Sequence, residues 1–125
     1  MVKTREEQQL EMEQAFNRVM PDFSIIPYVG CYAEVNLEYS LTAMCPVCYP
    51  IRDRYTLKIT FVPDRDLPEL ISFMEYLDAF CDIAITHEHL ASKIREEFNK
   101  KVMPISLDVI LETHVKGGLK VTVRC

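Results

Sequence analysis

The stretch RYTLKITFV (54–62) alternates polar and apolar side chains along its length. It sets Tyr55, Leu57, Ile59 and Phe61 on one face of an extended chain. A period of two is typical of a β-strand that buries one face and leaves the other toward solvent. The stretch therefore predicts a strand that lines one side of a hydrophobic core.

Three further strands are expected on either side of this one. The first covers 31–40, where Val35, Leu37 and Tyr39 alternate with polar residues. The other two, at 105–114 and 119–124, are joined across Lys116-Gly117-Gly118. Glycines between two extended stretches are typical of a hairpin turn. The strands thus form two pairs.

Two helices are predicted between these strand pairs. Pro68 suits the first turn of a helix that runs to about Phe80, and its apolar residues recur at the spacing of one helix face. Thr86 can cap a second helix that runs to about Lys101. His87 and Glu88 would then lie in the first turn of that helix.

A further helix is expected near the N-terminus. Thr4 and Glu7 form a capping-box pattern, and Pro21 stops the helix that they begin. With 125 residues, about half of them apolar, the chain is long enough for one domain. We expect a single domain over 1–125, in which 1–30 is an N-terminal helical extension.

The order helix, ββ, αα, ββ predicts an α+β fold. Two strand pairs that flank two helices suggest an antiparallel four-stranded sheet with both helices on one face. Such a sheet has unpaired edges, which favour pairing with further copies of the chain. We therefore expect a homo-oligomer that closes a barrel.

Composition narrows the functional classes. A net charge of −5 argues against a monomer that binds nucleic acid through a broad basic face. An oligomer could still gather Lys93, Arg95, Lys100 and Lys101 into one basic surface. The first residues contain no apolar run that would indicate a signal peptide or a membrane span, so a cytoplasmic protein is expected.

The residues that point most clearly to chemistry are Cys45, Asp53 and the pair His87-Glu88. Five cysteines are an odd number in a chain large enough to own a core, which disfavours a disulfide framework and favours a reactive thiol. Thiol addition to an electrophilic carbon needs a thiolate nucleophile, a proton donor and a group that holds the substrate. Cys45, Asp53 and Glu88 are one candidate for each role.

Other interpretations of these residues remain open. Cys45 and Cys48 could be a redox pair or half of a zinc site, although no second pair follows at ligand spacing. Asp53 lies between Arg52 and Arg54 and could be a surface ion pair. Glu88 could simply complement the positive end of its helix.

From about residue 31 onward the chain resembles the single-domain 7-cyano-7-deazaguanine reductase (QueF) family. The resemblance rests on the following landmarks, which occur in the family order: Cys45-Pro46-Val47, Asp53, Phe61-Val62-Pro63, Glu69-Leu70, Tyr76-Leu77, Phe80, His87-Glu88 and Gly117-Gly118. One residue more than the family spacing separates Cys45 from Asp53. The resemblance implies the tunnelling fold (T-fold), in which small antiparallel sheets assemble into a barrel.

The resemblance also implies a site for 7-cyano-7-deazaguanine. Cys45 would attack the nitrile carbon to give a covalent thioimide, and Asp53 would give a proton to the nitrogen. Glu88 would accept hydrogen bonds from the edge of the base, and His87 would line the same pocket. Contacts largely through backbone are implied for 68–70, that is, for Pro68, Glu69 and Leu70.

The part of the family pattern that is associated with NADPH is not kept. Family reductases carry two lysines in the helix that follows Glu69, and here the matching positions are Ile71 and Met74. Nearby Glu75, Asp78 and Asp82 make this region acidic, which opposes a phosphate-rich dinucleotide. The chain thus resembles the amidine-forming QueF-like branch from archaea, which needs no redox cofactor.

Three functional hypotheses follow. The first is amidine formation from the nitrile of 7-cyano-7-deazaguanine and ammonia, with the base carried by tRNA and without a cofactor or metal. The second is an NADPH-dependent nitrile reductase with an altered cofactor site. The third is a non-catalytic base-binding or metal-stabilised module.

Overall fold

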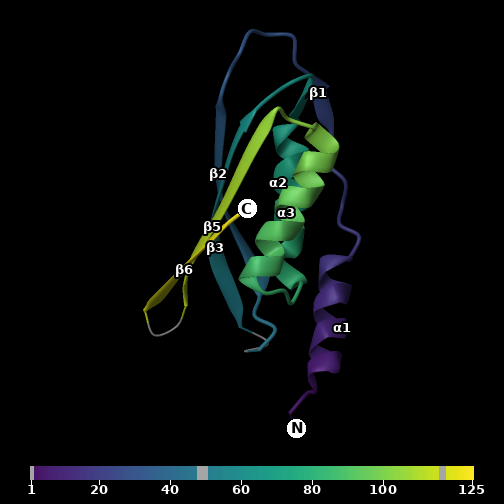
Figure 1. Cartoon of the computed structure of the whole chain (residues 1–125), viewed down its shortest axis with the longest axis vertical. Coiled ribbons are helices and arrows are strands. Elements are labelled where there is room, and N and C mark those ends of the chain that lie inside the picture. Colours follow the sequence, from purple (N-terminus) through teal and green to yellow (C-terminus); the bar gives the residue numbers. More distant parts are fainter. Residues whose placement is uncertain (1, 48–50, 116–117) are drawn as a thin grey trace.

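The computed structural model describes residues 2–47, 51–115 and 118–125. A four-stranded antiparallel sheet in the order β2-β3-β5-β6 forms one layer. Helices α2 and α3 cover one face of this sheet (Figure 1). The elements are, in chain order, α1 (Arg5–Phe16), β1 (Ile25–Pro27), β2 (Val35–Met44), β3 (Arg52–Val62), β4 (Asp66–Pro68), α2 (Leu70–Asp78), the 3₁₀ turn η1 (Ala79–Asp82), α3 (His87–Val102), β5 (Ser106–Val115) and β6 (Leu119–Arg124). The predicted α+β architecture is confirmed.

Strand β3 lies inside the sheet and follows the alternation of its sequence. Tyr55, Leu57, Ile59 and Phe61 are each about 1% exposed and face the helices. Burial of one such side chain contributes ~1.5–3 kcal/mol. Because a shift of register by one residue would turn this whole row to solvent, the pattern also fixes how β3 pairs with its neighbours.

The observed bounds of β2 and α2 differ from the predicted ones for local reasons. β2 runs four residues beyond the predicted 31–40, because its pairing with β3 continues to Met44, opposite Arg52. The helix predicted from Pro68 begins at Leu70, because the Glu69 side chain accepts hydrogen bonds from the amides of Ile71 and Ser72 and so caps it. Pro68 belongs instead to β4.

The two covering helices pack through aromatic side chains. Phe98 of α3 is fully buried and its ring lies 5.1 Å from that of Phe61 and 5.5 Å from that of Phe73. Phe23, from the segment before β1, adds a further ring 4.9 Å from Phe73. The core is therefore shared by the sheet, both helices and part of the N-terminal segment.

The N-terminal segment is only partly the helical extension predicted for 1–30. The capping box of Thr4 and Glu7 is present, but α1 ends at Phe16 rather than at Pro21. None of the residues of α1, all of which the structure describes, is buried. Beyond the helix, Met20 is buried and β1 pairs with β4, so the latter part of this segment belongs to the body of the fold.

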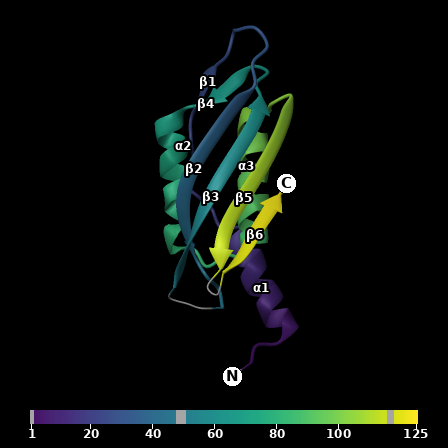
Figure 2. The ribbon, with the colours of Figure 1, turned by 90° about the vertical axis from the view of Figure 1, so that its left-hand side faces the viewer.

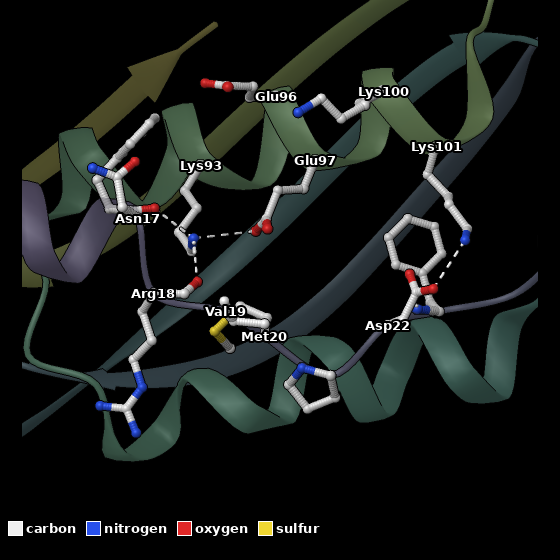
Figure 3. Close-up of a pocket in the computed structure, with 13 residues that line it drawn as sticks. Asn17, Arg18, Val19, Met20, Asp22, Lys93, Glu96, Glu97, Lys100 and Lys101 are labelled. Atoms are coloured by element: carbon white, nitrogen blue, oxygen red, sulfur yellow. Dashed lines mark hydrogen bonds and ion pairs between the residues drawn. The ribbon is translucent and has the colours of Figure 1, made fainter.

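Lys93 ties the end of α1 to α3. Its side chain is 4% exposed, and its ammonium donates hydrogen bonds to the carbonyl oxygens of Phe16 and Arg18 (Figure 3). It also lies 3.6 Å from the Glu97 carboxylate, which accepts a hydrogen bond from the Tyr76 hydroxyl. A buried charge is stable only with such partners, so Lys93 serves the fold.

Three of the four residues suggested for a basic surface of an oligomer make contacts within the chain, and the fourth, Lys100, is exposed. Lys93 is buried, and Arg95 donates hydrogen bonds to the carbonyl oxygens of Leu107 and Cys125. Lys101 forms an ion pair with Asp22 (Figure 3).

Within the described parts of the chain, no helix is long and apolar enough to cross a membrane.

Candidate active site

Cys45 follows the last residue of β2 and continues its pairing with β3. Its amide donates a hydrogen bond of 3.0 Å to the carbonyl oxygen of Ile51. Two residues before Cys45 along β2, Ala43 pairs with Asp53. Because side chains two apart share a face, Cys45 and Asp53 are diagonal neighbours on the side that faces the helices. Asp53 precedes the predicted strand 54–62, but in the structure it lies within β3, so the strand fixes the direction of its side chain.

The start of α3 is held against the same end of β2. The amide of Met44 donates to the carbonyl oxygen of Ile83, and the amide of Ile85 donates to that of Met44. The Thr86 hydroxyl then caps α3, as predicted. These backbone bonds bring His87 and Glu88 to the strand end that carries Cys45.

Tyr55 stands at the centre of the group and was missed as a site residue in the sequence. Its hydroxyl lies 3.5 Å from the Asp53 carboxylate, to which it can donate. Burial raises the pKa of Tyr55, and the negative charges that Asp53, Cys45 and Glu88 can carry raise it further. The phenol therefore stays neutral and keeps its proton as a donor.

A signal for Tyr55 existed in the sequence. The alternation places it on the face of Asp53, two residues along the same strand. The same alternation also places it in a row with Leu57, Ile59 and Phe61, so it was interpreted as a core residue. Only the tertiary structure shows that its hydroxyl lies beside the Asp53 carboxylate.

His87 offers an unused polar atom to the same space. Its ring packs edge-on against that of Tyr55 with centroids 5.8 Å apart. Within the described parts of the chain, its Nδ1 is buried without a hydrogen-bond partner, since the Glu88 carboxylate is 3.7 Å away. Buried polar atoms usually have partners, so an unpaired one in a cluster of this kind is available to a ligand.

The chemistry open to this cluster is addition of a thiol to an electrophile. Cys45 is a half-buried nucleophile, Asp53 is a half-buried carboxyl that can carry a proton, and Glu88 is an exposed acceptor in the first turn of α3. Proton transfer needs the donor within hydrogen-bond reach of the reacting group. A diagonal pair puts both side chains on one face of the sheet, where a substrate between them can contact both. Cys48, the other half of the possible redox or zinc pair, lies outside the described residues.

A groove opens beside the Cys45 loop. It has a volume of about 720 Å³ and lies between α1 and the loop, with Met12 on one wall and Pro46, Val47 and Thr86 on the other. In the described ranges, no group of three or more His, Cys, Asp or Glu side chains lies close enough together to hold a metal ion. The groove adjoins the residues that follow Cys45 and precede His87, but Cys45, Asp53 and Glu88 are not among the described residues that line it.

Pro68, Glu69 and Leu70 do not join this cluster within one chain. They lie where β4 meets α2, at the end of the sheet opposite to the β2–β3 loop (Figure 2). The Glu69 carboxylate caps α2, and these amide hydrogen bonds lower its pKa. The predicted site residues therefore form two groups at opposite ends of the molecule.

Comparison with known proteins shows the family to which the chain belongs. A family model described as QueF-like protein matches residues 53–125. A protein of Caldicellulosiruptor bescii, named NADPH-dependent 7-cyano-7-deazaguanine reductase, is 32% identical over 102 residues, which are 78% of this chain and 76% of that protein. A protein of the same name from Pelodictyon phaeoclathratiforme is 34% identical over 89 residues, 71% of this chain and 74% of the relative.

A solved structure supports the fold. The apo form of the archaeosine synthase QueF-Like aligns with a TM-score of 0.66 and 21% identity, over 73% of this chain and 91% of that one. This likeness carries the T-fold topology, which the residue landmarks imply. Because the family model matches more than half of the chain and two relatives above 30% identity are covered over most of their length, the chain belongs to the QueF-like family.

Proposed function

We propose that the chain is an enzyme that acts on the nitrile of 7-cyano-7-deazaguanine and converts it with ammonia into an amidine. The observation that carries the proposal is the convergence of Cys45, Asp53 and Glu88 around the buried hydroxyl of Tyr55. Family membership supports the nitrile as the electrophile, because relatives are named for action on this base.

The first step would be covalent. Sulfur of Cys45 attacks the nitrile carbon and forms a C–S bond, while the electron pair of one C–N π bond moves to nitrogen. Asp53 first takes the proton of the Cys45 thiol and then gives this proton to the nitrogen. Dividing the addition into activated steps lowers the barrier for a weak electrophile such as a nitrile.

The second step would release the enzyme. Ammonia attacks the thioimide carbon, the C–S bond breaks, and Cys45 leaves as a thiolate with the amidine as product. Electrons are neither gained nor lost by the carbon in this exchange, so a hydride donor is not required. Asp53 or His87 would move the proton that ammonia gives up.

Recognition of the base would fall to the first turn of α3. The N–H groups of the heterocycle need an acceptor, and Glu88 presents a carboxylate that is 64% exposed. A carboxylate is a favourable group at this position, because the helix begins there with its positive end. His87 would use its unpaired Nδ1 toward the same ring.

The second candidate is an NADPH-dependent nitrile reductase, favoured by the names of the relatives. The α2 face does not fit the cofactor, since Ile71 and Met74 are 64% and 39% exposed where family reductases carry lysines. Asp78 accepts a hydrogen bond from Tyr39, and Asp82 forms an ion pair with Arg52. The charged groups near this face are therefore carboxylates, or a cation that already has a partner. This face would repel phosphates rather than bind them.

The co-reactant can be tested directly. Protein is incubated with 7-cyano-7-deazaguanine, free or carried by tRNA, together with either ammonium or NADPH, and the products are identified by mass spectrometry. We expect the amidine with ammonium and no aminomethyl base with NADPH. Formation of the aminomethyl base would establish the reductase instead. The two carriers show whether tRNA is the partner, as the resemblance to the archaeal branch implies.

We further propose that a second copy of the chain completes the site. Pro68, Glu69 and Leu70 are implied contacts of the base, yet in one chain they lie at the end opposite Cys45. The outer strands β2 and β6 leave two sheet edges where copies can pair. Contacts between copies would bring the 68–70 end of one chain to the Cys45 end of another.

This assembly has a simple measurement. Size-exclusion chromatography with light scattering is expected to give a mass that is a multiple of the 14.6 kDa chain. A mass of one chain at concentrations where the enzyme turns over would mean that 68–70 play no part in the site.

A further inference from the structure

We propose that Tyr55 is a positioning residue for the nitrile-addition step, acting through Asp53. The inference rests on the proposed function and adds to it a residue that neither the family landmarks nor the sequence pattern assigned to the site. It starts from the place of the hydroxyl, which sits beside Asp53 beneath the strand end that carries Cys45.

Packing alone does not account for the hydroxyl. Tyr55 is 1% exposed in a row whose other members, Leu57, Ile59 and Phe61, are fully apolar. A buried hydroxyl without a good hydrogen bond is destabilising relative to an apolar group of the same shape. Its bond to Asp53, at 3.5 Å, is long for a partner that serves only the fold.

Tyr76 shows what a structural tyrosine looks like in the same protein. It is 2% exposed, and its hydroxyl donates to the Glu97 carboxylate at 2.6 Å, within the network that anchors Lys93. That bond is short and connects two helices. The bond of Tyr55 is long and points at a carboxyl two residues away on its own strand. Catalytic hydrogen bonds are often long in a ligand-free protein and tighten when substrate binds.

The geometry suggests what Tyr55 does. Its hydroxyl approaches Oδ2 of Asp53, which leaves Oδ1 to carry the proton for the nitrile nitrogen. The ring is itself fixed by its contact with His87. Since burial and the neighbouring charges raise its pKa, the phenol remains a donor throughout the reaction. Tyr55 would thus hold the proton donor in one orientation without exchanging a proton itself.

The test compares Tyr55→Phe with wild type in the formation of the Cys45 adduct. Protein is mixed with saturating and with limiting 7-cyano-7-deazaguanine, without co-reactant, and the covalent adduct is followed by intact mass against time. We expect the rate at saturation to fall by about 10- to 100-fold, because the variant loses a hydrogen bond to the negative charge that develops on Asp53 as it gives up its proton. The concentration that gives half the maximal rate should change less than about threefold, because the ring and its packing remain.

Two controls separate positioning from stability. Tyr76→Phe removes a hydroxyl that is equally buried and also bonded to a carboxylate, but away from Cys45, and should leave the adduct rate within about twofold of wild type. In an Asp53→Asn background, Tyr55→Phe should add less than about a twofold further loss, because the two residues act as a unit.

The outcomes are distinct. An adduct that forms in Tyr55→Phe at the wild-type rate overturns the role of Tyr55 and leaves the proposed function standing. Equal losses in Tyr55→Phe and Tyr76→Phe would assign both hydroxyls to stability and overturn it too. If wild type itself forms no adduct, the proposed function fails, and the role of Tyr55 in it fails with it.

Discussion

Replacing Cys45 with alanine is expected to abolish conversion of 7-cyano-7-deazaguanine, with a loss of about 10⁴-fold or more. The covalent thioimide cannot form without the sulfur, and removal of a nucleophile commonly costs this much in kcat. Product formation is measured by mass spectrometry with ammonium present, and the protein mass is recorded in parallel samples without ammonium, in which the adduct is not released. Wild type should gain the mass of the whole base, and Cys45→Ala should not.

A matched control is available in the same chain. Cys125 is also half-buried, but it follows β6 and its sulfur lies 3.9 Å from the Ser92 hydroxyl, apart from the group around Cys45. Cys125→Ala should keep both turnover and the adduct. Full conversion by Cys45→Ala would refute the covalent mechanism through Cys45. Binding of the base by wild type without product and without adduct would refute both enzyme hypotheses and leave a non-catalytic base-binding module as the remaining interpretation.

Replacing Lys93 with methionine is expected to lower the free energy of unfolding by about 2–4 kcal/mol. Methionine keeps much of the apolar length but leaves the carbonyl oxygens of Phe16 and Arg18 without their donor. It also leaves Glu97 without its ion pair, and breaking one partner of a buried pair is strongly destabilising. Thermal unfolding should show a Tm lower by roughly 10 °C.

The same helix provides the control for this prediction. Lys100 is exposed on the rim of the groove that Figure 3 shows, so Lys100→Met should change Tm by less than about 2 °C. Hydrogen exchange adds a local readout, since α1 should lose protection in Lys93→Met before the sheet does. Unchanged stability together with unchanged exchange in α1 would mean that the Lys93 network does not anchor the N-terminal helix.

Much of the fold could be predicted because its signals are local. The alternation at 54–62 identified β3, and the capping residues Thr4 and Thr86 identified the starts of α1 and α3. Errors occurred where a long-range partner decides the outcome. The pairing of β1 with β4 was missed, since neither three-residue strand has a pattern that is visible without the other.

The candidate site was predictable in its residue types but not in its arrangement. Cys45, Asp53, His87 and Glu88 were singled out by the chemistry of their side chains and by the family landmarks. Their proximity follows from the β2–β3 register and from the backbone bonds of Met44 to Ile83 and Ile85. The fold places Pro68, Glu69 and Leu70 at the opposite end of the sheet. Residue spacing alone does not reveal this separation.

By itself, the sequence determined which segments form the four-stranded sheet and the three helices, and which side chains can perform thiol chemistry. These properties depend on residues within a few positions of one another, through periodicity, capping and the intrinsic reactivity of each group. Only the tertiary structure decided that the Tyr55 hydroxyl lies beside Asp53, that Lys93 and Arg95 hold the fold together, and that the implied contacts lie at two ends of the chain. Those outcomes depend on hydrogen bonds between segments far apart in the chain, such as Lys93 with Phe16, and no local pattern encodes them.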